Sequence, residues 1–133
     1  MSRSGYMDDL EPWDLIRWRG AVASAIRGRR GQAFLKEMLA ALDGLPNQRL
    51  ISEALEFGGE VCAIGSVGKV RNVDMKDIDV DDHEMVAVAF KIPHSFACEI
   101  MYINDEGNWE KETPEERFQR VRAWVVNQIR ASK

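Results

Sequence analysis

The sequence lacks the features that cross-link a protein or carry it across a membrane. Its two cysteines, Cys62 and Cys98, have apolar neighbours, so both are expected to be small core residues in a reducing compartment. No apolar run approaches about 18 residues, so no membrane-spanning helix is expected. The acidic start of the chain lacks the apolar segment of a signal peptide. We therefore expect a cytoplasmic protein.

Motifs for catalysis and cofactor binding are also missing. Asp77, Asp79 and Asp81 have the initial spacing of a calcium loop, but Val88 occupies the position of the bidentate glutamate. The stretch GSVGKV, residues 65–70, has its glycines too close together for a phosphate loop. With two histidines in the chain, no set of nucleophile, base and orienting group is found. An enzyme is therefore the less favoured class, and no cofactor is expected.

Four residues of the chain have side chains that could bind zinc. His94 and Cys98 are four residues apart and would share one face of a helix, and Cys62 and His83 could complete the set. The spacing fits no usual zinc module, because the chain has no close Cys-x-x-Cys pair. We therefore expect buried cysteines, surface histidines and no bound metal.

The charges are segregated along the chain. The net charge of −4 divides into −2 for residues 1–12, +4 for 13–49, −9 for 50–112 and +3 for 113–133. Two basic segments thus flank an acidic middle. If these segments pack together, one face of the fold is basic and the opposite face acidic, which affects association with partners rather than the fold.

Apolar periodicity predicts an all-α fold, a compact single domain of five to six helices. We expect the domain to span residues 11–131, after a flexible N-terminus of residues 1–10. Pro12 marks the first helix start, Gly44 a helix end, and Thr113-Pro114-Glu115-Glu116 the start of the last helix. The expected core stripes are Leu15, Trp18, Val22 and Ile26; Phe34, Leu35, Met38, Leu39 and Leu42; Met85, Val86, Ala89 and Phe90; Phe96, Ala97, Ile100 and Met101; and Phe118, Val121, Val125 and Ile129.

Residues 47–73 are ambiguous. Leu50-Ile51 and Val61–Ile64 fit short strands, which would give a minor strand element within residues 50–70. They also fit helices that begin at about Ser52 and about Glu60, and we favour this interpretation although several glycines weaken the signal. At Gly65 and Gly68 we expect close helix packing.

The stretch HEMVAVAFKIPHSFACEIMYIND, residues 83–105, has the pattern of a helix-turn-helix, with Ala87 as the small residue of its first helix. The second helix would present His94, Ser95 and Tyr102 to DNA. These side chains supply little of the positive charge that dominates DNA affinity. We therefore favour a core helical hairpin and keep a DNA-binding regulator as the alternative.

Five arginines lie in RWRGAVASAIRGRRGQAF, residues 17–34. Projected on one continuous helix, Arg19, Arg27 and Arg30 share a side, and Arg17 and Arg29 point elsewhere. Two interpretations stay open, a solvated helix flank whose side chains cover apolar surface, or a basic face that docks on an acidic protein or a nucleic-acid backbone. The candidate partner-binding residues are Arg19, Arg27, Arg30, Arg117 and Arg120.

With WRGAVASAIRGRRGQAFLKEMLAALD, residues 18–43, and NDEGNWEKETPEERFQRVRAWV, residues 104–125, the chain resembles a group of small uncharacterised proteins encoded by bacteriophages and prophages. The likeness covers most of the chain. That group has no assigned activity, so the resemblance implies no site residues. It implies an accessory protein that acts on a host or phage macromolecule, a class that includes inhibitors of host defence.

The leading hypothesis is a non-enzymatic phage accessory protein in the cytoplasm of a bacterial host. Its most favoured partner is a host or phage protein, with nucleic acid as the alternative. A small enzyme with an unrecognised site is the second alternative. The four tryptophans and the glycines permit a homodimer without requiring one.

Overall fold

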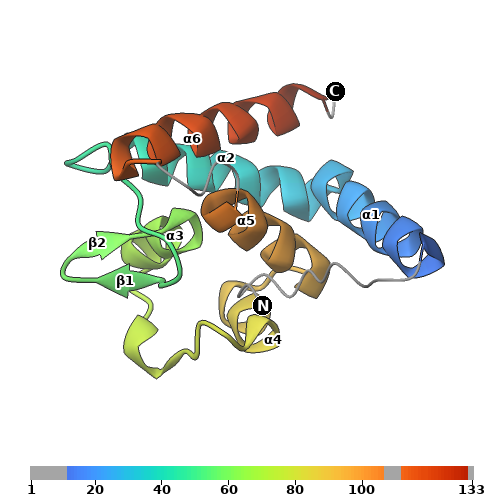
Figure 1. Ribbon diagram of the computed structural model, residues 1–133, viewed down its shortest axis with the longest axis horizontal. Coiled ribbons are helices and arrows are strands. Elements are labelled where there is room, and N and C mark those ends of the chain that lie inside the picture. The colour runs from blue at the N-terminus through green and yellow to red at the C-terminus, as the bar shows by residue number, and fades with distance from the viewer. Residues whose placement is uncertain (1–11, 107–111, 132–133) are drawn as a thin grey trace.

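The computed structural model describes residues 12–106 and 112–131 (Figure 1). The elements in chain order are α1 (Pro12–Arg27), α2 (Arg29–Asp43), β1 (Glu56–Phe57), β2 (Glu60–Val61), α3 (Ala63–Arg71), the 3-10 turn η1 (Met75–Asp77), α4 (His83–Phe90), α5 (His94–Glu106) and α6 (Pro114–Ala131). The predicted all-α class with a minor strand element is confirmed. The predicted flexible N-terminus, residues 1–10, lies outside the described residues.

Capping residues define several helix boundaries, and those at Thr113 and Gly44 were predicted. Thr113 and Glu116 form a capping box, in which each side chain accepts a hydrogen bond from the other residue's backbone N–H at 3.1 Å and 2.9 Å. Helix α2 ends at Gly44, whose N–H donates to carbonyls of the last turn. Asp82 caps α4 by accepting from the N–H of Met85 at 3.1 Å.

The prediction of a helix from about Ser52 was wrong. Residues 56–61 instead form a hairpin in which Phe57 pairs with Glu60, and the two residues between them, Gly58 and Gly59, have φ of 59° and 84°. A two-residue hairpin loop with two positive φ values is the geometry that Gly-Gly favours. The helix expected from about Glu60 begins at Ala63, because the chain before it is held in the hairpin.

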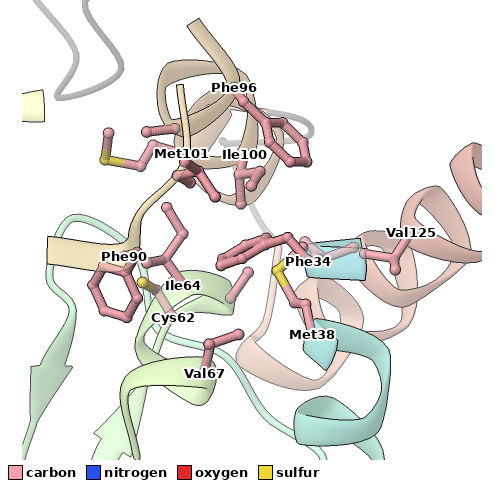
Figure 2. Close-up of a cluster of buried hydrophobic side chains, with 14 of the residues drawn as sticks. Phe34, Met38, Cys62, Ile64, Val67, Phe90, Phe96, Ile100, Met101 and Val125 are labelled. Atoms are coloured by element: carbon pink, nitrogen blue, oxygen red, sulfur yellow. The ribbon is translucent and has the colours of Figure 1, made fainter. Parts of the chain in front are cut away.

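Helix α5 lies at the centre of the fold and packs against α1, α3, α4 and α6. Figure 1 shows α2 and α6 side by side, with α5 beneath them and α4 beyond α5. Figure 2 shows side chains from α2, α3, α4, α5 and α6 meeting in one cluster. The labelled residues there are Phe34, Met38, Cys62, Ile64, Val67, Phe90, Phe96, Ile100, Met101 and Val125.

Most of the predicted core stripes are buried, with two clear exceptions. Val22 and Ile26 of α1 lie in the core as predicted, and Trp18 is half-buried. Leu15 is 46% exposed, because the first turns of α1 lie at the edge of the molecule (Figure 1). Met85 is 41% exposed, and the buried residues of α4 are Val86, Ala87 and Phe90.

The glycines of α3 pack closely, as predicted. A Cβ at Gly65 would overlap the backbone carbonyl of Leu55, and a Cβ at Gly68 would lie 2.6 Å from Met75 Sδ and 3.0 Å from Phe90 Cζ. Only a residue without a side chain lets α3 approach these neighbours so closely.

A buried asparagine fixes the irregular segment before α3. Asn104 accepts a hydrogen bond from the N–H of Ala63 at 3.0 Å and donates to the carbonyl of Ile51 at 2.9 Å. The side chain is fully buried, so these bonds satisfy polar atoms that would otherwise destabilise the core.

Hydropathy gives no membrane-spanning helix in the described ranges. No single helix there is long and apolar enough to cross a membrane. Helices α4 and α5 meet that criterion of length and composition only when taken together, and the chain turns by 108° between them.

Candidate functional site

The arginines whose side chains the structure describes divide into paired and unpaired groups. Six form ion pairs with carboxylates: Arg19 with Glu99, Arg49 with Glu60 and Glu115, Arg71 with Glu37, Arg117 and Arg120 with Glu112, and Arg122 with Asp43. Within residues 12–106 and 112–131, no carboxylate forms an ion pair with Arg17, Arg27, Arg29 or Arg30, and all four are exposed. The unpaired arginines therefore gather on α1 and the start of α2.

One side of α1 is exposed along its whole length. At 100° per residue, the exposed residues of this side span an arc of about 100° on the helix, opposite the buried Val22 and Ile26. Trp13 is 73% exposed and Ile16 is 62% exposed, which is unusual for large apolar side chains. We call this side the α1 stripe, and it consists of Trp13, Ile16, Arg17, Gly20, Ser24 and Arg27.

The projection that grouped Arg30 with Arg19 and Arg27 was wrong in its assumption of a continuous helix. Gly28 has φ −67° and ψ 161°, an extended conformation that separates α1 from α2. Gln32 bridges the break by donating from its Nε2 to the carbonyl of Ile26 at 2.7 Å. Arg30 therefore lies in the first turn of α2 rather than on the side of α1.

A groove runs beside the α1 stripe. It has a volume of about 260 Å³ and is lined by α1, α5 and α6. Arg19 donates to both carboxylate oxygens of Glu99, at 2.8 Å and 3.4 Å, and this carboxylate side chain is 5% exposed. Arg19 thus neutralises a buried charge at the base of the groove, whereas Arg27 lines the same groove without an ion pair to any described carboxylate.

Arg117 and Arg120, also predicted to bind a partner, point toward the interior. Arg117 is 8% exposed and donates to the carbonyl of Leu50 at 2.9 Å. Arg120 donates twice to Glu112, at 2.6 Å and 2.9 Å, and also to the carbonyls of Ile103 and Asn104. These contacts connect α6 to α5 and to the segment before the hairpin, so they leave little of either side chain for a partner.

The predicted helical hairpin of residues 83–105 is present as α4 and α5, and Lys91 takes the left-handed conformation at its turn with φ 59°. The 108° change of direction is within the range of a helix-turn-helix. However, the second helix is buried from Phe96 to Met101, and His94, Ser95 and Tyr102 are half-buried. A helix covered in this way has no free face to place in a DNA groove, which favours the core hairpin.

Three of the four residues considered as zinc ligands lie together. His83, at the start of α4, stacks on His94 with ring centroids 4.4 Å apart, and Cys98 Sγ lies 3.6 Å from His94 Nε2. Burial lowers the pKa of His94, and burial together with the negative charge of Glu99 raises the pKa of Cys98 to about 12. Cys62 lies elsewhere, where its Sγ caps α3.

Comparisons with known protein families, with curated proteins and with solved structures found no match. The site is therefore defined by its own geometry. Sequence reasoning missed Glu99, Trp124 and Gln128 as groove-lining residues and Glu112 as a buried partner of arginine. Their contacts join distant parts of the chain, and no local pattern indicates them.

Proposed function

We propose that the chain is a non-enzymatic binding protein that docks on an acidic surface of another protein. The binding surface is the α1 stripe together with Arg29 and Arg30 at the start of α2. In the setting that the phage resemblance implies, it acts in the cytoplasm of a bacterial host. Its partner there is a host or phage protein, and binding inhibits a component of host defence.

The observation that carries the proposal is the combination of exposed apolar residues with unpaired arginines on one helix. Tryptophan and arginine are enriched among the residues that dominate protein interfaces. Here Trp13 and Ile16 precede Arg17 on the same exposed side, and Arg27 continues it. Charges with no partner in the described fold are free to pair with carboxylates on another molecule, and they would steer its approach.

The same combination favours a protein partner over nucleic acid. Binding to a nucleic-acid backbone depends on the number of phosphates that basic residues neutralise. The chain has a net charge of −4, and six of the arginines in its described part already pair with its own carboxylates. Exposed Ile16 adds apolar area that suits a protein surface better than a phosphate backbone.

The test begins with capture of the partner from a nuclease-treated bacterial lysate, followed by calorimetry with the purified partner. The variant Ile16→Asp with Arg27→Glu changes two exposed residues of the α1 stripe. Hot-spot residues contribute about 2 kcal/mol or more, so the affinity should fall by at least about 30-fold.

The matched control is Val88→Asp with Lys91→Glu, which makes the same kinds of change at exposed positions of α4 and its turn. Its affinity for the partner should equal that of the unaltered chain. An equal loss in both variants, or a complex that nuclease dissolves, would contradict the proposal. Dissolution by nuclease would instead favour the nucleic-acid alternative.

A further inference from the structure

The ends of α4 and α5 bring together three side chains with metal-binding atoms. One such atom from each of His83, His94 and Cys98 lies within 4.8 Å of the other two. His94 and Cys98 occupy successive turns on one face of α5, and His83 reaches them from the first residue of α4. Helices position ligands more precisely than loops do.

We propose that His83, His94 and Cys98 form a binding site for one divalent transition-metal ion, with zinc as the expected occupant. Two imidazoles and one thiolate are donors that Zn²⁺ prefers, whereas Mg²⁺ and Ca²⁺ require oxygen ligands. Zinc replaces the proton of the Cys98 thiol, which passes to solvent. Because the chain supplies three ligands, a water molecule takes the fourth position of the tetrahedron.

The spacing of two ligands already fits this ion. Tetrahedral zinc with Zn–N near 2.05 Å and Zn–S near 2.3 Å places its nitrogen and sulfur ligands about 3.6 Å apart. Cys98 Sγ and His94 Nε2 are separated by 3.6 Å. The ligand atom of His83 lies within 4.8 Å of the other two ligand atoms. Because the His83 ring stacks on that of His94, it has to turn out of the stack to aim a nitrogen at the same ion.

An unsatisfied atom at the same place independently indicates a ligand. His83 Nδ1 is buried and has no hydrogen-bond partner in the described part of the chain. Buried polar atoms are almost always paired, so an exception needs an explanation. Coordination of a metal ion through Nδ1 satisfies this atom in place of a hydrogen bond and holds the ring in position.

The local charge also favours a cation. Residues 74–84, which include His83, carry six acidic residues and one lysine. Both histidines lie at helix N-termini, whose dipoles disfavour a cation. Glu84, the residue after His83, opposes this effect at His94, since a carboxylate carries a full negative charge and a helix end about half of a positive one.

The experiment titrates the full-length chain, reduced and free of chelators, with Co²⁺ and then with Zn²⁺. We expect one Co²⁺ per chain with a thiolate-to-cobalt charge-transfer absorption, which Zn²⁺ then abolishes by displacing the cobalt. Loss of an outer-shell partner alone costs about 10–100-fold in metal affinity. Cys98→Ala and His83→Gln should therefore each weaken zinc binding by at least about 100-fold, and Cys98→Ala should also abolish the charge-transfer band.

Two features keep the outcome decisive. His83 is only half-buried, so His83→Gln should fold even if a change at buried Cys98 does not, and circular dichroism checks both variants. Cys62→Ala removes the other buried thiol and should leave the cobalt spectrum unchanged. An absent charge-transfer band in the unaltered chain, unchanged zinc affinity in His83→Gln, or loss of the band in Cys62→Ala would each overturn the proposal.

Discussion

At the scale of single residues, the absence of a side chain at Gly65 allows α3 to contact the segment before the hairpin. The carbonyl of Leu55 occupies the space that a Cβ would need, and it also accepts a hydrogen bond from the N–H of Cys62 at 3.1 Å. We predict that Gly65→Ala lowers the free energy of unfolding by about 3 kcal/mol, since overpacking against backbone cannot be relieved by rotating a side chain. Urea denaturation measures this loss.

Gly20 provides the matched control for that substitution. It lies in the middle of α1, and no atom of another described element lies within 4 Å of the position of an added Cβ. Alanine is favoured over glycine inside a helix by up to about 1 kcal/mol, so Gly20→Ala should raise the free energy of unfolding. Similar losses in both variants would contradict the role assigned to Gly65.

At the scale of the elements, one ion pair joins three helices. Arg71, the last residue of α3, donates to both carboxylate oxygens of Glu37 on α2, at 2.8 Å and 2.6 Å. It also donates to the carbonyl of Phe90 at the end of α4, at 3.0 Å, and its guanidinium lies 5.5 Å from the ring centre of Phe34. Arg71 therefore stabilises the packing of α3 and α4 against α2.

We predict that Arg71→Ala lowers the free energy of unfolding by about 1 to 2 kcal/mol at neutral pH, less than a buried pair because solvent screens it. The hydrogen bonds from Arg71 lower the pKa of Glu37 below its ordinary value of 4.5. The contribution of the pair to the free energy of unfolding is thus complete above pH 4.5. It is lost as the pH falls through the lower pKa that Glu37 has in the folded state. Urea denaturation should show the two proteins converging in that acid range.

Arg122→Ala is the control, because Arg122 and Asp43 form a similar pair whose side chains are 39% and 49% exposed. The loss of stability there should be smaller than for Arg71→Ala. A constant difference between Arg71→Ala and the unaltered chain at every pH would show that the effect comes from packing rather than from the charge of Glu37.

Most of the helices could be predicted because their signals are local. The capping box at Thr113 and the stripes of α2 and α6 depend on residues within a few positions of one another. The hairpin was missed because two residues per strand are too short to show alternation, and Gly58-Gly59 was interpreted as a weakness in a helix. Its position depends on Asn104, which is distant in sequence and hydrogen-bonds to the segment on either side of the hairpin.

At the scale of the whole molecule, the basic ends of the chain do pack together, since α2 and α6 are neighbours (Figure 1). Much of their charge is neutralised within the fold, by Asp43 at Arg122 and by Glu112 at Arg117 and Arg120. Among the arginines that the structure describes, those without an ion pair therefore lie on α1 and at its junction with α2. Summing charges along the sequence could not predict this, because it does not show which residues pair.

We predict that this junction governs retention on a cation-exchange resin at low salt. Replacing Arg27, Arg29 and Arg30 with glutamine changes the net charge from −4 to −7 and should shift elution to a clearly lower salt concentration. The physical reason is that the Debye length is about 30 Å at 0.01 M salt. A resin therefore binds a local cluster of positive charge more strongly than the net charge alone would indicate.

The control replaces Lys36, Lys69 and Lys76 with glutamine. These three lysines are exposed on α2, α3 and η1. It reaches the same net charge of −7 by removing charges that are scattered over the surface. Its elution should move less than that of the arginine variant. Equal shifts would indicate that the arginines do not act as a cluster.

The candidate site was predictable only in part. Sequence reasoning identified Arg19 and Arg27, which line one groove, and it named His83, His94 and Cys98 as metal-binding residue types. It could not show that the histidines stack, because the loop between α3 and α4 sets the position of His83 relative to α5.

The central position of α5 has a consequence for how the protein is made. A ribosome adds about 5–20 residues per second, and α1 and α2 emerge several seconds before α5. During that time the nascent chain lacks the helix that packs against α1 and that later meets α3, α4 and α6. Folding of this chain is therefore deferred until its second half is synthesised, and until then the apolar residues of the first two helices lack the helix that packs against α1.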